Sequence, residues 1–320
     1  MELVAATGDA LRQILDSSYP LWGEGLSRRG YEQYNVAQLA TRWGRERLTR
    51  VALVERGRVL SSAKRYALDL SIDGKPVRTL GIGAVFTPPG LRGRGHARAL
   101  LTRLLEQARE EGFAASLLFS EIGAAYYKGL GFTVVPRDTL KMAIARRPGA
   151  PGIVMRGGDA RDIPLMSEMH DDLAARYRLT LRRAPEWIEY TLARKRLLSG
   201  FVAAGDREVL FFVVEEGGRA VAYAVVVATP DGWALEECGD RDPSGARVGA
   251  ILQTLLAREP SSRGPVIWGW LPDGWLPPQL SIVARGAAEQ VMMIRPLANE
   301  GRIDPPLQAA SVHYWHSDVF

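Results

Sequence analysis

The stretch Leu80–Phe132, LGIGAVFTPPGLRGRGHARALLTRLLEQAREEGFAASLLFSEIGAAYYKGLGF, decides the fold of this chain. It begins with an apolar strand, which ends at the Thr-Pro-Pro-Gly segment 87–90 because proline cannot donate to a strand ladder. A loop of glycines and arginines follows, then an amphipathic helix, a second apolar strand and a short helix before Gly131 and Phe132. This order predicts an α/β unit with a ligand site at the loop.

The loop before the helix has the composition of an anion site. Glycines let the backbone come close to a ligand, and the first amides of a helix have no partner within the helix. These amides, the helix dipole and the two arginine side chains favour a phosphate-bearing cofactor. The residues that we expect around the phosphate are Arg92, Gly93, Arg94, Gly95, His96 and Ala97.

The spacing of the loop residues narrows the choice of cofactor. A nucleotide triphosphatase loop needs Lys followed by Ser or Thr, and the chain has His96-Ala97 there instead. The dinucleotide fingerprint needs a glycine spacing that this loop does not have. The pattern Arg/Gln-x-x-Gly-x-Gly/Ala is met by Arg92, Gly95 and Ala97.

That pattern resembles the pyrophosphate loop of the GNAT superfamily of N-acetyltransferases. The segment Tyr127–Phe132 is similar to the Tyr-x-x-x-Gly-Phe end of the same motif, and the resemblance is specific over residues 50–135. It implies acetyl-CoA as the cofactor. It also implies that two neighbouring strands splay apart, so that the backbones of Val85, Phe86 and Thr87 pair with the pantetheine amides.

The order of predicted elements repeats in the second half of the chain. We therefore expect an α/β protein with mixed (α+β) sheets, made of two tandem GNAT folds: a catalytic domain 1–147, a linker 148–152 and a GNAT-like domain 153–320. The second copy has Gly-Asp-Arg-Asp-Pro-Ser at 239–244 in place of the loop. Two aspartates would repel pyrophosphate, so we expect the second copy to be degenerate.

Two groups of two-unit acetyltransferases share further features with the chain. The enhanced-intracellular-survival aminoglycoside acetyltransferases have a Ser-Glu pair similar to Ser120 and Glu121, but they add a sterol-carrier-like domain for which this chain has too few residues. The fungal free-lysine acetyltransferases have segments similar to Trp-Gly-Glu-Gly-Leu-Ser at 22–27 and Leu-Phe-Ser-Glu-Ile-Gly at 118–123. Both resemblances imply a small-molecule amine as acceptor, such as an amino acid, a polyamine or an aminoglycoside.

The resemblance also assigns chemical roles. Tyr127 matches the hydroxyl that protonates the leaving thiolate, and a tyrosine buried only for packing is the alternative. Glu121 is a candidate base or cofactor-loop residue, or else a solvated acid, and Ser120 is a candidate cofactor contact. An acetyl-CoA-binding sensor or scaffold without turnover remains the alternative to an N-acetyltransferase.

The last residues, 312–320, are aromatic and apolar, so we expect them to dock against the fold rather than fray. In the survival-type enzymes a C-terminal phenylalanine carboxylate is the proposed base, and this sequence ends in Phe320. A tail that only seals the core is the alternative. Near the other end, the segment 18–25 interrupts a mostly helical region, and we expect either a substrate wall or a helix connection there.

The composition argues against several other classes of protein. The 320 residues are 47% hydrophobic and 24% charged with a net charge of +5, and no basic run with interleaved aromatics indicates a nucleic-acid partner. The one cysteine, Cys238, stands among acids that would raise its pKa, and the four histidines have no metal-ligand spacing. Neither a signal peptide nor a membrane span is expected, so the cytoplasm is the default location. The sequence does not indicate an oligomeric state.

Overall fold

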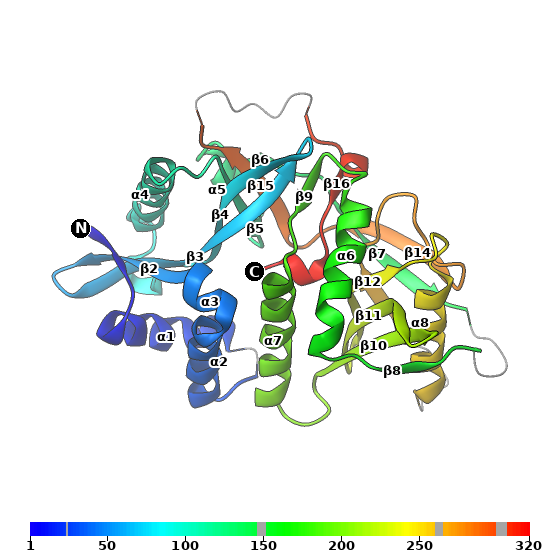
Figure 1. Cartoon of the computed structure of the whole chain (residues 1–320). Helices are drawn as coiled ribbons and strands as arrows, with labels where there is room; N and C mark the ends of the chain where they lie inside the picture. Colours follow the sequence, from blue (N-terminus) through cyan, green and yellow to red (C-terminus); the bar gives the residue numbers. More distant parts are fainter. Residues whose placement is uncertain (24, 146–151, 260–264, 299–305) are drawn as a thin grey trace. The chain divides into compact units, whose positions relative to one another are not determined.

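The structure is a computed structural model (Figure 1). It describes residues 1–23, 25–145, 152–259, 265–298 and 306–320. The chain divides into two units, which we call the first unit (Met1–Pro136, Gln290–Leu307 and Phe320) and the second unit (Arg137–Glu289 and Gln308–Val319). Each unit contains a mixed sheet with helices, so the predicted fold class is confirmed. No helix in the described part of the chain is long and apolar enough to cross a membrane.

The strands of the first unit run in the order β1-β2-β3-β4-β5-β15-β6. Only β4 and β5 pair in parallel, and the other neighbours pair antiparallel. The strands are β1 (Glu2–Ala5), β2 (Leu48–Glu55), β3 (Arg58–Ile72), β4 (Lys75–Phe86), β5 (Ala115–Ser120), β6 (Thr133–Val134) and β15 (Val291–Pro296). The helices are α1 (Gly8–Trp22), α2 (Arg28–Ala40), α3 (Arg42–Arg47), α4 (His96–Glu110) and α5 (Ala125–Lys128).

Alternation along β2 gives the first sheet two apolar faces. Val51 and Leu53 pack with the buried leucines of α4, whereas Ala52 between them packs with Ile14 of α1. The buried residues of α4 form one stripe, as expected for the predicted amphipathic helix: Leu100, Leu101, Leu104, Leu105 and Ala108. Figure 1 shows α4 and α1 on opposite sides of this sheet.

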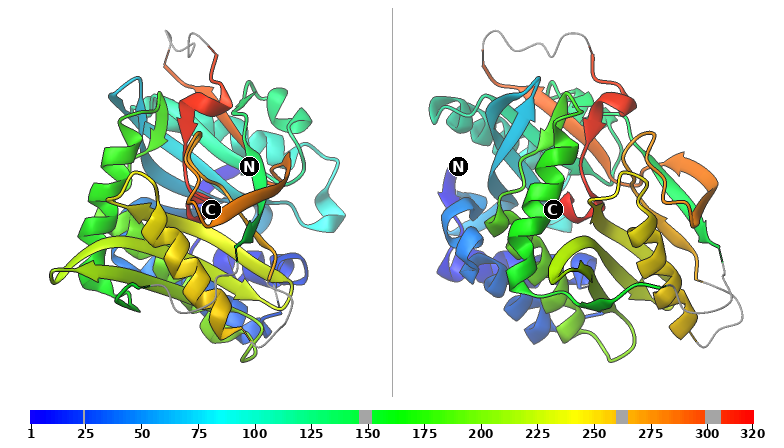
Figure 2. Two further views of the ribbon diagram at one scale, coloured as in Figure 1. Left: turned by 90° about the vertical axis from the view of Figure 1, so that its right-hand side faces the viewer. Right: turned by 45° about the vertical axis from the view of Figure 1, so that its right-hand side comes forward.

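The second unit repeats this arrangement with the order β14-β7-β13-β12-β11-β10-β8, in which β12 and β13 pair in parallel. Figure 2 shows α8 on one face of its sheet, where its leucines pack. The strands are β7 (Asp138–Ile144), β8 (Met155–Gly157), β10 (Glu208–Glu216), β11 (Arg219–Thr229), β12 (Gly232–Asp240), β13 (Ile267–Gly269) and β14 (Leu280–Ala287). Two short strands, β9 (Leu179–Leu181) and β16 (Val312–His313), form a parallel pair. The helices are α6 (Ile163–Ala174), α7 (Pro185–Phe201) and α8 (Ala246–Arg258).

The two halves of the chain exchange one strand each. β7, from the first half, lies between β13 and β14 of the second sheet, and β15, from the second half, lies between β5 and β6 of the first. The units therefore depart from the predicted division at residues 147 and 153. The sequence does not tell which sheet a strand joins, because pairing partners leave no local signal. Residues 148–151 of the predicted linker lie outside the described residues.

The N-terminal helices differ in one detail from the expectation. Helix α1 continues through Pro20 to Trp22, so the interruption predicted at 18–25 is shorter. Trp22 packs edge-on against Phe86 at the end of β4, with ring centroids 5.6 Å apart. The tail docks as predicted, since residues Val312–Trp315 are buried in the second unit.

Two buried histidines of the second unit couple its stability to pH. His170 and His313 are 2% and 0% exposed, with ring centroids 5.7 Å apart. Burial, together with the charge of Arg183, lowers the pKa of His170 from 6.5 to about 4. Burial lowers the pKa of His313 well below its ordinary value as well. His170 Nε2–H donates to the Leu181 carbonyl, which suits the neutral ring.

We expect the free energy of unfolding to fall as pH drops below 6.5. The unfolded chain takes up protons there and the folded one does not, so stability present above pH 6.5 is lost towards pH 4. The loss between pH 7 and pH 5.5 should be about 1 kcal/mol per histidine. Urea unfolding at both pH values checks this, and His170→Gln should reduce the difference by about half. A wild-type protein equally stable at the two pH values would contradict it.

Candidate active site

The strand that leads into the loop is irregular where it approaches the candidate site. Between the pairs Ser62↔Phe86 and Lys64↔Gly83, β4 advances one residue more than β3, and Ala84 has φ +46°. A non-glycine residue in this region marks a bulge that bends the strand.

Strands β4 and β5 stop pairing at the same place. Their parallel register runs from Thr79↔Ala115 to Ile82↔Leu118, so residues 83–86 extend past the last pair. Their backbone groups on this side have no partner in β5. The separation of strands that the resemblance implied is therefore present.

Helix α4 begins without a cap. Its N-cap is Gly95 in the left-handed conformation (φ +79°), no side chain bonds to its first amides, and its first turn holds no acid. Gly93 is also left-handed (φ +76°), and a Cβ at either glycine would meet nothing within 4 Å. The amides at the start of α4 therefore open on free space, which an anion can fill.

Several predicted cofactor residues are brought together at this end of β4. Arg92 is exposed, and its Nε donates to the Thr87 carbonyl at 3.2 Å. Ser61 Oγ donates to the Phe86 carbonyl at 2.9 Å and lies 3.0 Å from Thr87 Oγ1. These bonds fix the strand end against the loop.

The other predicted cofactor residues differ in what they offer a ligand. Gly93, Arg94 and Gly95 are exposed, and Val85, His96 and Ala97 are partly exposed. Ser120 is buried, and its Oγ donates to the Gly123 carbonyl at 2.6 Å. The Ser120 hydroxyl proton is therefore used within its own turn.

The second unit has a helix in the same topological place, but its start is filled. Helix α8 also follows a left-handed glycine, Gly245 (φ +70°). Asp240 Oδ2 accepts the amides of Arg247 and Val248 at 2.9 and 3.4 Å, and the Asp240 side chain is 0% exposed. A Cβ at Gly245 would meet Trp275 at 2.5 Å. The carboxylate occupies the anion position of this helix, so the second unit has no open phosphate site there.

Tyr127 lies in the apolar core that α4 helps to form and is 7% exposed. Burial, with smaller effects of Tyr126 and Glu121, raises the pKa of its hydroxyl to about 12. Glu121 itself is exposed, and its charge acts on Tyr127. Tyr127 therefore keeps its proton at neutral pH.

Phe320 belongs to the first unit, and β4 is shaped to receive it. Its ring centroid lies 4.4 Å from that of Tyr66 and 5.3 Å from that of Phe119. A Cβ at Gly81 would come within 2.9 Å of the ring, and one at Gly83 within 3.0 Å of the Phe320 main-chain oxygen. We call Tyr66, Gly81, Gly83 and Phe119 the Phe320 seat.

This seat was not predicted from the sequence. The alternation Gly81-Ile82-Gly83 inside an apolar strand was the available signal, because glycine within a strand marks the close approach of another group. Alternation places both glycines on the face opposite Ile82, which lies in the core beside α4.

Comparison with known proteins agrees with this geometry. Residues 15–135 match the family model described as an acetyltransferase (GNAT) domain. No curated protein matches the sequence. The matched residues include the open loop and the separated strands, so this part of the chain is similar to a GNAT acetyltransferase domain.

Solved structures share the fold at low identity. A probable N-acyltransferase of Enterococcus faecalis superposes with a TM-score of 0.69 at 13% identity, over 92% of this chain and 72% of that one. Eis1 from Mycobacterium abscessus gives 0.56 at 14% identity, over 93% and 74% of the two chains. A tandem GNAT protein from the clavulanic acid biosynthesis pathway gives 0.53 at 16% identity, over 93% and 99%.

Substitutions in the loops before α4 and α8 should have different effects on acetyl-CoA binding. Arg92→Ala should weaken acetyl-CoA binding about tenfold by removing one charged contact, and Gly95→Asp should weaken it about 100-fold or more. Asp240→Ala is the matched control: it should cost about 1.5–3 kcal/mol of stability, because the first amides of α8 lose a charged acceptor, and it should leave acetyl-CoA affinity unchanged. Calorimetric titration of each variant checks this. Equal affinity losses in Arg92→Ala and Asp240→Ala would contradict the assignment.

Proposed function

We propose that the chain is an N-acetyltransferase that moves the acetyl group of acetyl-CoA to the primary amine of a small molecule. The uncapped start of α4 carries this proposal, because it offers amides and arginines to a pyrophosphate beside a strand end that has no partner in β5. A small acceptor is supported by the fold shared with a protein of a small-molecule pathway. The chain then acts as an enzyme on metabolites and needs no nucleic acid or membrane partner.

When bound, acetyl-CoA supplies a thioester carbonyl that an amine can attack. In our proposal the amides of His96, Ala97 and Arg98 and the side chain of Arg92 bind its pyrophosphate. The backbone groups of Val85, which have no partner in β5, and the amide of Thr87 orient the pantetheine. An amide at the bulged end of β4 stabilises the charge that develops on the carbonyl oxygen.

The proton steps fall to Tyr127 and Phe320. Tyr127 stays protonated at neutral pH and donates to the departing thiolate. The α-carboxylate of Phe320, seated at Gly83 one residue before the bulge, accepts the proton of the attacking amine. Glu121 is exposed and raises the pKa of Tyr127, so we give it a supporting role in holding that proton.

A substrate screen tests the function directly. Release of coenzyme A thiol is followed with free amino acids, polyamines and aminoglycosides as acceptors, and one amine class should accelerate it. Binding of acetyl-CoA without thiol release for any amine would favour the alternative function, an acetyl-CoA-binding sensor or scaffold without turnover.

Replacing the proposed acid should affect chemistry rather than binding. Tyr127→Phe should lower kcat about 100-fold and leave acetyl-CoA affinity within about twofold, because only the proton for the thiolate is lost. Tyr126→Phe is the matched control, since Tyr126 is 38% exposed and packs beside Tyr127. Full turnover in Tyr127→Phe, with chemistry rate-limiting, would reject Tyr127 as the acid.

Altering Phe320 or its seat should remove the base. Amidation of the Phe320 carboxylate should lower kcat about 100-fold at an unchanged melting temperature. Gly83→Ala should lower kcat at least about tenfold, because its Cβ would meet the Phe320 main-chain oxygen. Gly286→Ala in β14 is the control, since a Cβ there meets nothing within 4 Å. An amidated enzyme with full activity would exclude the carboxylate.

A further inference from the structure

The sheet of the second unit has the same separation of parallel strands as the first. β12 and β13 pair only as far as Leu235↔Gly269, so residues 236–240 extend past the last pair. The start of α8, which follows this strand end, is filled by the Asp240 carboxylate and closed by Trp275. The second unit therefore has the opening between the strands without the phosphate site, and a ligand held there has to be smaller than coenzyme A.

A cavity of about 230 Å³ lies at this opening, between the end of β12, helix α6 and the loop after β13. Cys238, Gly239 and Asp240 at the end of β12 form part of its wall. The rest of the wall is largely apolar and includes Met169, Leu173, Pro243, Pro272, Trp275 and Trp315. Because an apolar cavity of about 150 Å³ holds benzene, this one has room for a single ring with a short side chain.

Two aromatic side chains of the wall carry ring nitrogens that have no hydrogen-bond partner among the described residues. His170 is 2% exposed, and its Nε2–H donates to the Leu181 carbonyl, so Nδ1 is left as an acceptor. Trp315 is 1% exposed, and its Nε1–H is left as a donor. Buried polar atoms are usually satisfied, so these two favour a ligand with a polar group at the inner end of the cavity. A hydroxyl group suits either nitrogen, because it both donates and accepts.

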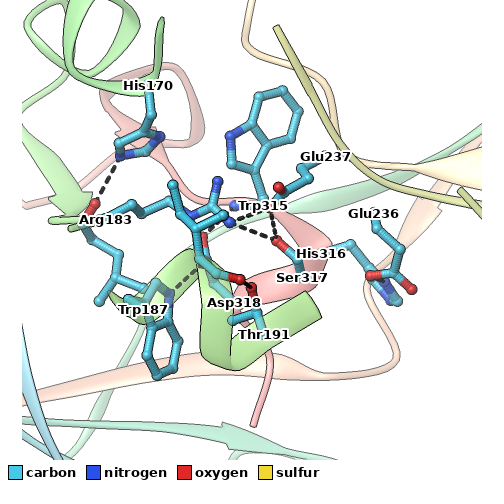
Figure 3. A network of polar contacts seen from close by, with 12 residues as sticks. His170, Arg183, Trp187, Thr191, Glu236, Glu237, Trp315, His316, Ser317 and Asp318 are labelled. Carbon is cyan, nitrogen blue, oxygen red and sulfur yellow. Dashed lines mark hydrogen bonds and ion pairs between the residues drawn. The ribbon is translucent and has the colours of Figure 1, made fainter. Parts of the chain in front are cut away.

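Buried ion pairs hold Trp315 in place. Asp318 Oδ2 accepts the Trp315 amide at 2.8 Å, and Arg183 pairs with both Asp318 and Glu237. Burial opposes the charged form of Arg183, but the two carboxylates outweigh it and raise the pKa of the guanidinium. Figure 3 shows His170 and Trp315 together with these charged side chains. This part of the wall is therefore preformed, which lowers the entropic cost of binding a ligand.

The mouth of the cavity offers a positive charge to a ligand. Asp172, Arg176 and Arg241 are exposed residues of the lining. Arg241 is paired with Asp172 at 2.9 Å and with Glu168 at 2.8 Å, and Asp240 is already bonded to the first amides of α8. Arg176 forms no ion pair within the part of the chain that the structure describes. A carboxylate on the ligand would give Arg176 a partner of opposite charge.

We propose that this cavity binds a small aromatic carboxylic acid with a hydroxyl group on its ring. The carboxylate lies at the mouth with Arg176, the ring fills the apolar part beside Trp275, and the hydroxyl bonds His170 or Trp315. Asp240 keeps a pyrophosphate out, so the ligand is of a different class from the cofactor of the first unit. The proposal concerns the second unit alone and does not depend on the acetyl transfer proposed above.

Calorimetric titration of the full chain with three related probes tests the proposal. The first, para-hydroxyphenylpropionate, has the ring, the short chain and both polar groups. Phenylpropionate lacks the hydroxyl group, and para-hydroxyphenylpropanol lacks the charge. Each probe is also titrated into Arg176→Gln. Arg161→Gln is the matched control, because Arg161 is an exposed arginine of the second unit that does not line this cavity.

We expect para-hydroxyphenylpropionate to bind with a dissociation constant below about 1 mM, and the other two probes to bind about fivefold more weakly. Arg176→Gln should weaken the binding of the two acids about threefold and leave that of the alcohol unchanged, and Arg161→Gln should change none of them. Leu173→Trp, which fills the cavity with a larger side chain, should abolish the binding of all three probes at an unchanged acetyl-CoA affinity.

Three results would overturn the proposal. One is the absence of binding of para-hydroxyphenylpropionate at millimolar concentration, and another is equal affinity for all three probes. The third is an equal effect of Arg176→Gln and Arg161→Gln on the binding of the acids. Displacement of the bound acid by acetyl-CoA would also contradict a separate site in the second unit.

Discussion

No side chain caps the first amides of α4, whereas the first amides of α8 donate to a buried carboxylate. This difference distinguishes the first unit from the second. Both helices begin after a left-handed glycine, in the loop that follows a strand whose next neighbour runs parallel, so the backbone geometry is shared. A bond from a carboxylate to an amide contributes about 1.5–3 kcal/mol. A phosphate approaching α8 would have to displace Asp240 and lose that contribution. It would also meet the ring of Trp275, so the second copy is closed by its own side chains.

The exchange of β7 and β15 determines how the first sheet is completed. β15 pairs with β5 along its whole length, from Val291↔Ser120 to Pro296↔Ala115. One edge of β5 is therefore fully bonded while the other separates from β4 after Leu118. Because β15 comes from the far end of the chain, a fragment ending at Pro136 would expose that edge of β5. The first unit is thus contiguous in space but not in sequence.

The sequence predicted what local pattern encodes and missed what depends on distant partners. The α4 stripe, the apolar strands and the Arg92–Ala97 loop were found because periodicity and turn chemistry are local. The strand exchange was missed because register is set by tertiary packing. Asp240 was predicted to repel pyrophosphate, and its capping bonds to Arg247 and Val248 became visible only in the structure. Arg183 forms buried ion pairs with Glu237 and Asp318, which lie far away in the sequence, and no spacing rule connects the three residues.

One open helix start should give the chain one acetyl-CoA site. Isothermal titration of the full chain with acetyl-CoA measures this stoichiometry directly. We expect one site per chain, lost in Gly95→Asp and retained in Asp240→Ala. Two sites of similar affinity per chain, or a single site that survives Gly95→Asp and disappears in Asp240→Ala, would contradict it.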